Sequence, residues 1–309
     1  MALSVSVGEA RVTVFNTGHL QADLDDWLRL LPPAWSPRYT ALFEQPFAVP
    51  IQCVHIQSGP ASVLVDAPQY DLPPPGLMLP DYRPPPGLAA QLWEAGISPG
   101  AVEHVVITHL HFDHYGAVAT QQGKRYAPAF ANARYHIGRA DWERPQTQRA
   151  MRRRNSEDAR TLGVLEAGKV VDLVSASREL AAGITILPAP GETAGHLVVR
   201  VHSAGETLYC VGDLFHHPVE IERPEWGPHW ADHAALLASR RSLIDAALAE
   251  EALLVATHIP GLGRFEPTAE GVRWVEVEST DQADHTRSPT TGDGPRPTPS
   301  GFTDQQIHN

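Results

Sequence analysis

One run of seven residues, Thr108-His109-Leu110-His111-Phe112-Asp113-His114, constrains this chain more than any other feature. It follows the apolar segment 105–107, whose β-branched residues are typical of a buried strand. Side chains alternate along a strand, so we expect His109 and His111 on one side of the extended backbone. Neutral imidazole nitrogens and carboxylate oxygens are the ligands that Zn²⁺ and similar ions take in proteins. The run therefore predicts a metal site at the end of a strand rather than a histidine-rich surface loop.

The end of the run and three later segments predict a second ion beside the first. Asp113 and His114 come where the strand should turn into a helix, so they are expected to face another ion nearby. Further candidate ligands are His196, which ends the segment 190–196, and Asp213 and His258, each of which follows an apolar run. Their order and setting are those expected of a two-metal site.

Taken together, the seven candidate ligands resemble the signature of the metallo-β-lactamase superfamily, and the resemblance covers roughly residues 10–275. It implies an α/β fold, the four-layer αββα sandwich, in which two mixed sheets lie between two helical layers and the metals sit at one edge. It also implies two divalent ions as cofactors, with zinc the first choice. In that family the first ion would take His109, His111 and His196, the second would take Asp113, His114 and His258, and Asp213 would bridge both.

A two-metal site of this kind predicts metal-assisted hydrolysis by a metal-bridging hydroxide, without a serine or cysteine nucleophile. Asp113 is expected to orient the nucleophile or to carry a proton to the leaving group. Within the superfamily the motif resembles the N-acyl-homoserine lactonases, which implies a lactone or carboxylic ester as substrate. Those lactonases often carry a tyrosine three residues after the bridging aspartate. His216 occupies that position here, and we expect it to donate a hydrogen bond to the substrate carbonyl.

Other activities are compatible with the same ligands. The glyoxalase II branch is a thioesterase that shares all seven, but after residue 275 this chain lacks the basic helical region with which that enzyme grips glutathione. Phosphotriester hydrolysis is a further enzymatic alternative. The non-enzymatic alternative is a catalytically inactive metal-binding module, although loss of catalysis usually shows as missing ligands.

Composition and length narrow the class of protein. The 309 residues alone suggest about two domains, but the spread of the motifs predicts one catalytic domain over residues 1–279. The polar segment 280–309 holds too few apolar residues to offset the entropy of ordering, so we predict a disordered tail. A formal net charge of -12 argues against a nucleic-acid partner and leaves a small-molecule substrate.

Location and assembly follow from similar considerations. The first residues lack the pattern of a signal peptide, and no run of apolar residues is long enough to cross a membrane, so a cytoplasmic protein is the expectation. Cys53 and Cys210 lie in apolar runs and are predicted to be buried free thiols. A homodimer is compatible with the family, and the proline-rich loop 67–86 is a candidate contact.

Several features keep two interpretations. Asp66, at the end of an expected strand, either supports a metal-binding histidine through a hydrogen bond or serves as a turn residue. Segment 216–230, with two tryptophans and three histidines in fifteen residues, forms either a pocket wall or part of the core. Helices are expected at 88–95, from 138 onward and at 231–249, and strands at 11–15, 49–57, 61–65, 102–107, 133–137, 170–174, 183–187, 196–201, 207–211, 253–256, 263–265 and 271–275.

Overall fold

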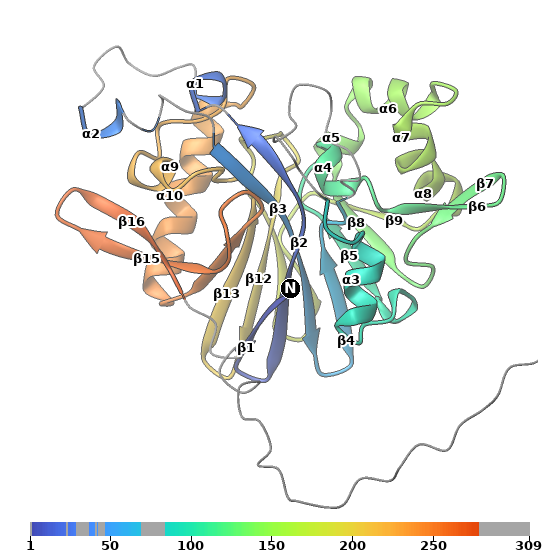
Figure 1. Cartoon of the computed structure of the whole chain (residues 1–309), viewed down its shortest axis with the longest axis horizontal. Helices are drawn as coiled ribbons and strands as arrows, with labels where there is room; N and C mark the ends of the chain where they lie inside the picture. Colours follow the sequence, from blue (N-terminus) through green and yellow to red (C-terminus); the bar gives the residue numbers. More distant parts are fainter. Residues whose placement is uncertain are drawn as a thin grey trace, which may run out of the picture.

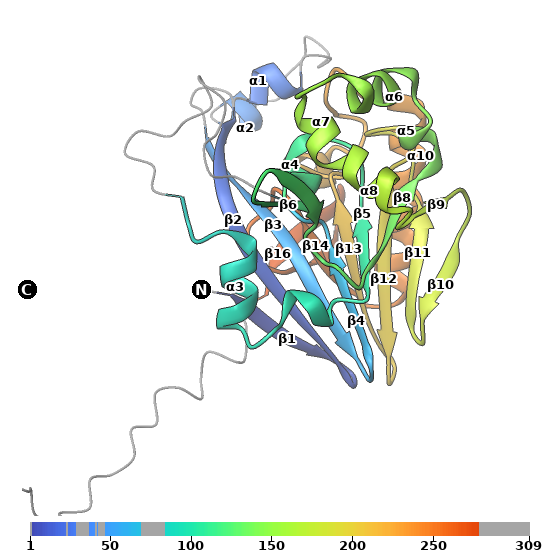
Figure 2. The same ribbon diagram turned by 90° about the vertical axis from the view of Figure 1, so that its right-hand side faces the viewer.

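A computed structural model describes residues 2–22, 24–28, 37–40, 42, 47–68 and 84–277. Two seven-stranded sheets pack face to face, and helices cover their outer faces (Figure 1, Figure 2). The expected four-layer α/β sandwich is therefore confirmed. The expected tail 280–309 and most of the proline-rich loop lie outside the described residues.

The first sheet has a mixed order in which β4, β5, β8 and β9 run parallel and the other pairs are antiparallel. Its central strands are short, apolar and β-branched, as expected for strands buried on both faces. Its members, in order across the sheet, are β1 (Leu3–Val7), β2 (Ala10–Ala22), β3 (Phe47–Ser58), β4 (Ala61–Val65), β5 (His104–Ile107), β8 (Arg134–Gly138) and β9 (Val171–Val174).

The second sheet is antiparallel except for β13 and β14, which run parallel in the middle. That parallel pair matters for function because the carboxyl ends of both strands reach the same edge. The strands, in order, are β10 (Arg178–Ala181), β11 (Ile184–Pro188), β12 (Leu197–Ser203), β13 (Glu206–Gly212), β14 (Leu253–Ala256), β15 (Gly263–Thr268) and β16 (Gly271–Glu276).

Helices are concentrated on the two outer faces and at one end of the sandwich, where α1, α4 and α9 lie (Figure 1). A hairpin of β6 (Ala119–Gln122) and β7 (Arg125–Pro128) stands apart from both sheets. The helices are α1 (Leu24–Trp27), α2 (Pro37–Thr40), α3 (Leu88–Glu94), α4 (Phe112–Tyr115), α5 (Arg139–Trp142), α6 (Pro145–Arg152), α7 (Glu157–Arg160), α8 (Leu162–Gly168), α9 (Val219–Glu222) and α10 (His233–Ala249).

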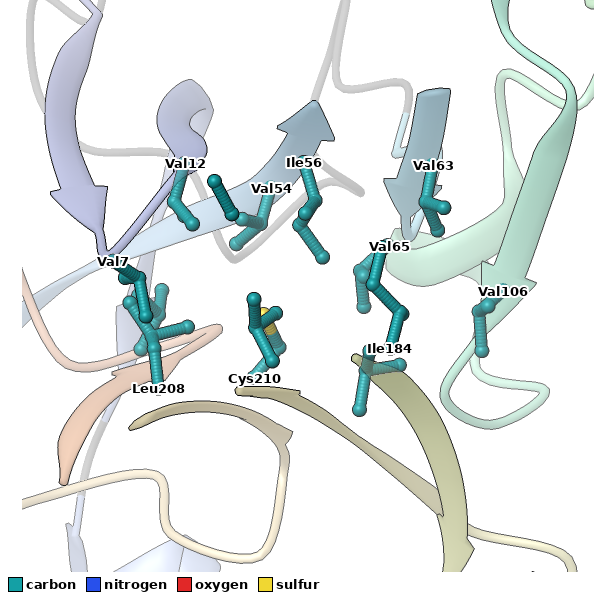
Figure 3. Close-up of a cluster of buried hydrophobic side chains, with 14 of the residues drawn as sticks. Val7, Val12, Val54, Ile56, Val63, Val65, Val106, Ile184, Leu208 and Cys210 are labelled. Atoms are coloured by element: carbon teal, nitrogen blue, oxygen red, sulfur yellow. The ribbon is translucent and has the colours of Figure 1, made fainter. Parts of the chain in front are cut away.

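Three layers of apolar side chains hold the sandwich together. The middle layer lies between the sheets and is dominated by valine, with Val54, Val65 and Cys210 among its members (Figure 3). Alternate residues of the same strands face outward, where α3 and α8 cover the first sheet and α10 covers the second. The two cysteines are free and buried, as predicted.

Most strands with strong apolar patterns begin and end within a few residues of their predicted positions. The prediction missed β1, β6, β7 and β10, which carry many polar residues and are largely or partly exposed. No helix among the described residues is long and apolar enough to cross a membrane.

Candidate metal centre

The metal motif begins where β5 ends and continues into α4. His111 has extended backbone and precedes the first helical residue, so the chain turns within the motif itself. This turn brings the rings of His109 and His114 together, with centroids 4.0 Å apart, and both side chains are fully buried. Phe112, between them, is directed outward and is 39 % exposed.

Asp66 fixes this turn from the neighbouring strand. Its carboxylate accepts hydrogen bonds from the backbone N–H of Thr108 at 2.7 Å and from the Thr108 hydroxyl at 2.9 Å. Its Oδ2 also lies 2.9 Å from His114 Nδ1, which leaves His114 Nε2 as the nitrogen directed at the site. This contact selects the supporting role for Asp66 over that of a simple turn residue.

Asp213 and His258 arrive from the second sheet. They follow the carboxyl ends of the parallel strands β13 and β14, so both meet the motif at one edge of the sandwich. Asp213 Oδ2 lies 3.3 Å from His114 Nε2, 3.3 Å from His258 Nε2 and 3.7 Å from His109 Nε2. A single carboxylate oxygen thus stands among three imidazoles, as a bridging ligand requires.

Two groups of donor atoms result. His109, His111, Glu192 and Asp213 present one donor atom each within 4.8 Å of one another, and Asp113, His114 and His258 form a second group. Six of the seven ligands expected from the sequence are therefore brought together. The seventh, His196, is buried at the border of the cluster, where its Nε2 accepts the backbone N–H of Asp213 at 3.2 Å.

Glu192 is the member of these groups that sequence reasoning missed. It lies four residues before His196, in the segment 190–196 from which only His196 was expected as a ligand. The one sequence signal for Glu192 was the presence of a carboxylate in this segment. Whether that carboxylate faces the other donors depends on how the segment folds. In the structure its Oε1 is 3.4 Å from His111 Nδ1, and its side chain is fully buried.

The donors differ in charge state. Burial would lower the pKa of His114 and His258, but Asp213 outweighs it and raises both, that of His258 to about 9. Other donors are already in the form that binds a cation. Burial lowers the pKa of His109 well below its usual value and that of His196 to about 3, so both rings are neutral at pH 7. Burial would raise the pKa of Asp113, but His114 and His258 outweigh it and lower that pKa to about 2. Neutral imidazole and ionised carboxylate are the forms that ligate metal.

Buried polar atoms without hydrogen-bond partners provide an independent test of whether the cluster suits bound metal ions. Among the described residues, six buried side-chain nitrogen or oxygen atoms have no hydrogen-bond partner, and five of them belong to this cluster. They include His114 Nε2, Glu192 Oε2 and Asp213 Oδ1. Buried polar atoms without partners cost free energy, so their convergence fits a site completed by divalent cations.

His216 lies inside the cluster, three residues after Asp213. Its Nε2 is 3.4 Å from Asp213 Oδ2, and its Nδ1 is 3.4 Å from Glu220 Oε2. Glu220 is itself held by Arg240 of α10 at 2.6 Å, and both of these side chains are fully buried. Burial alone would lower the pKa of His216, but Glu220 and Glu192 outweigh it and raise that pKa well above its usual value.

Aromatic side chains surround the donors. Trp27 of α1 packs edge-on against His216 and His258, with ring centroids 5.2 and 5.8 Å apart. Trp230 is 42 % exposed and contacts both Trp27 and His111, whereas Trp226 is buried in a small apolar cluster. The segment 216–230 therefore contributes both to the wall of the site and to the core, and neither interpretation alone was right.

This combination of fold and donor groups agrees with sequence comparison. Residues 76–258 match the model of the metallo-beta-lactamase superfamily, and this match spans more than half of the chain. The chain therefore belongs to that superfamily.

Individual relatives agree with this assignment. Two proteins named probable metallo-hydrolase, from Mycobacterium bovis and Mycobacterium tuberculosis, are 27% identical over 139 residues, which is 42% of this chain and 42% of each relative. The chain thus matches less than half the length of these curated relatives.

Solved structures share the fold. The hydrolase AbOPH of the beta lactamase superfamily superimposes with a TM-score of 0.72 at 16% identity, over 90% of this chain and 97% of that one. AidC, a dizinc quorum-quenching lactonase in complex with a homoserine product, gives a TM-score of 0.70 at 21% identity over the same shares. At these identities the similarity establishes the fold alone.

Proposed function

We propose that this protein is a two-metal hydrolase that cleaves lactones or carboxylic esters. The observation that carries the proposal is the convergence of two donor groups on Asp213 Oδ2 at the edge of the sandwich. Residues proposed to hold the ions are His109, His111 and His196 for the first, Asp113, His114 and His258 for the second, and Asp213 for both. Divalent ions bound there would polarise the substrate carbonyl and lower the pKa of a water toward about 7, and zinc suits these ligands.

Asp113 is the residue that we propose to handle the proton. Its side chain is 20 % exposed, whereas that of Asp213 is 3 % exposed, so Asp113 is the more accessible of the two carboxylates. One of its oxygens lies 3.4 Å from His258 Nε2, which fixes its orientation. From this position it would align the attacking water and pass a proton to the leaving oxygen.

His216 is the residue that we propose to bind the substrate carbonyl oxygen. Glu220 engages its Nδ1 side, so Nε2 is the nitrogen directed at the donor cluster. Because Arg240 holds Glu220 from the outer helical layer, the ring has little freedom to turn away. A fixed donor near the reacting carbonyl would stabilise negative charge that develops on its oxygen.

The surroundings favour a substrate with an apolar portion. Trp27 and Trp230 form an aromatic rim beside the donors, and Trp230 is substantially exposed. Such a rim would hold an acyl or alkyl chain while the ester bond reaches the donors. The lactonase product bound in the structurally similar AidC is of this type, which supports a lactone as the first substrate to test.

Hydrolysis of a small panel by purified protein of known metal content tests the proposal. The panel holds an acyl-homoserine lactone, an aliphatic lactone, an aryl ester, a glutathione thioester and an aryl phosphotriester. We expect chelator-sensitive turnover to be highest with the lactones or the aryl ester. Preference for the thioester or the phosphotriester would overturn the substrate class, and turnover that survives complete metal removal would overturn the metal-dependent chemistry.

A further inference from the structure

We infer that Glu192 is a metal ligand of this centre, so that a third carboxylate joins Asp113 and Asp213. The inference rests on the proposed metal-dependent function and specifies the donor set of the first ion. The ligands expected from the sequence include His196 at this point but no glutamate. The structure places the Glu192 carboxylate, with His109, His111 and Asp213, in one group of mutually close donor atoms.

The distances fit coordination. Two donors that each lie about 2.1 Å from a tetrahedral ion are about 3.4 Å apart. Glu192 Oε1 is 3.4 Å from His111 Nδ1, which matches this separation. That nitrogen is 2.8 Å from His109 Nε2, a hydrogen-bond distance that an ion between the two rings would lengthen. Two imidazole nitrogens and a carboxylate oxygen are thus close enough to share one cation.

The partners of Glu192 leave part of its carboxylate unsatisfied. Trp230 donates its indole N–H to Oε1 at 2.5 Å, and His216 Nε2 lies 3.8 Å from the same oxygen, beyond hydrogen-bond distance. The other oxygen, Oε2, is buried and has no hydrogen-bond partner among the described residues. A buried carboxylate in this state is costly unless a cation completes its environment.

The backbone holds Glu192 in place independently of any ion. Asp141 accepts hydrogen bonds from the Thr193 hydroxyl at 2.6 Å and from the Gly195 N–H at 2.8 Å. Gly191 has a φ of 147°, and a Cβ there would lie 2.2 Å from the Cα of Leu236 in α10. The segment is therefore fixed on both sides of Glu192, which presents the carboxylate to the imidazoles before metal arrives.

An added carboxylate alters which ions the first site prefers. Imidazole ligands suit Zn²⁺ and Fe²⁺, whereas carboxylate oxygens also suit harder ions such as Mn²⁺. With Glu192 as well as Asp213 among its ligands, the first site should bind Mn²⁺ more readily than a site in which Asp213 is the only carboxylate. Loss of Glu192 should consequently weaken Mn²⁺ binding more than Zn²⁺ binding.

Metal titration of the full-length apoprotein tests the assignment without reference to turnover. Zn²⁺ and Mn²⁺ affinities are measured by competition with a chromophoric chelator, and the stoichiometry is measured by elemental analysis. The variant is E192Q, which keeps the shape of the side chain and its capacity to accept the Trp230 hydrogen bond. We expect at least about tenfold weaker binding of one ion, the other unchanged, with the larger loss for Mn²⁺.

Two further variants calibrate the result. E225Q removes an exposed carboxylate outside both donor groups and should bind both ions as the wild type does. E192D keeps the charge but retracts it by one methylene, so it should fall between wild type and E192Q. It also supplies the test should E192Q fail to fold by circular dichroism.

Equal affinities and stoichiometry in folded wild type, E192Q and E192D would overturn the assignment. A change in the KM of E192Q without any change in its metal affinity would also overturn the assignment and would indicate that Glu192 contacts the substrate. The test also separates the two proposals. If E192Q binds metal more weakly but the wild type is inactive on every substrate, the proposed hydrolysis is refuted and the assignment of Glu192 as a ligand is supported. If the wild type is active but E192Q binds metal with unchanged affinity, the hydrolysis is supported and the ligand assignment is refuted.

Discussion

Strand β5 has a histidine cluster at each end, and the two clusters differ in how their ring nitrogens are partnered. At its start, His104 Nδ1 lies 3.0 Å from His136 Nε2, and Arg178 of the second sheet donates to His136 Nδ1 at 2.5 Å. Arginine is only a donor, so His136 accepts with Nδ1 and carries its proton on Nε2, which donates to His104. Asp172 lies 3.9 Å from the same ring. This cluster is closed by its own hydrogen bonds.

At the other end of β5, the donors of the candidate metal centre converge, and several of them are not satisfied by one another. His114 Nε2 and Asp213 Oδ1 are buried without hydrogen-bond partners in the part of the chain that the structure describes. In the first cluster Arg178 lies beside the ring nitrogen of His136, where its positive charge would repel a divalent ion. The comparison teaches that buried histidines indicate a metal site where donor atoms converge and some of them are left without hydrogen-bond partners.

The largest effect expected from this contrast is on catalysis. Asp213→Asn should reduce kcat/KM by more than about 100-fold, because it weakens the ligand shared by both donor groups. His136→Gln, which alters the closed cluster, should stay within about twofold of wild type. Steady-state kinetics on the best substrate of the panel would measure both. Wild-type turnover by a cleanly folded Asp213→Asn protein would refute the two-metal mechanism.

The next largest difference between the two clusters should be in how far added metal raises the free energy of unfolding. Ions that bind only the folded protein stabilise it by about 4 kcal/mol at a free concentration of roughly 1,000 times Kd. We expect this gain in wild type and in His136→Gln when urea unfolding is compared with and without metal. Asp213→Asn should retain less than half of it. An equal gain in all three proteins would mean that the metal binds elsewhere.

Acid should destabilise the closed cluster. Burial, followed by the Arg178 charge, lowers the pKa of His136 from 6.5 to about 3. The unfolded chain therefore binds more protons between these values, so the stability from neutral His136 is present above pH 6.5 and is lost as pH falls toward 3.

Between pH 7 and pH 4.5 the loss should be about 2.5 kcal/mol. His104, Arg134, Arg178 and Asp172 are the other charged or titratable groups that act on this ring. His136→Gln should show a correspondingly shallower pH dependence in urea unfolding of the apoprotein. An identical pH dependence in both proteins would contradict the closed-cluster description.

The smallest effect is expected from the polar tail, which we propose lies outside the catalytic domain of residues 1–279. Deleting residues 280–309 should leave the free energy of unfolding within about 0.5 kcal/mol of that of the full chain. Turnover should likewise be unchanged, because both donor groups lie before residue 259. A clear loss of activity in the shortened protein would refute this domain boundary.

The sequence predicts the fold well where the signal is local. The strand 61–65 and its hairpin with 49–57 follow from β-branched alternation and a Ser-Gly-Pro turn, and both are confirmed. Strands such as β6, β7 and β10 could not be predicted in the same way, because their polar residues acquire strand structure by pairing with a neighbour. Pairing is a property of the folded chain and leaves little trace in such short segments.

The residues of the candidate site are likewise predictable only where the sequence signal is local. Its histidines and aspartates are predictable because they follow apolar strands in a recognisable order. Glu192 is not, because a carboxylate becomes a candidate ligand only when Asp141 and Gly191 fix the backbone that turns it toward His111. Composition also does not show which tryptophan of segment 216–230 faces the site. In the structure Trp226 lies in the core and Trp230 lies at the site.

The distribution of donors along the chain also sets an order of events during synthesis. The first donor group is complete once Asp213 has left the ribosome, but the second needs His258, which follows the long helix α10. A nascent chain could therefore capture one ion well before it can capture two. In the two-metal centre proposed above, the second ion would bind only after β14 has joined the second sheet beside β13, when folding of the domain is almost finished.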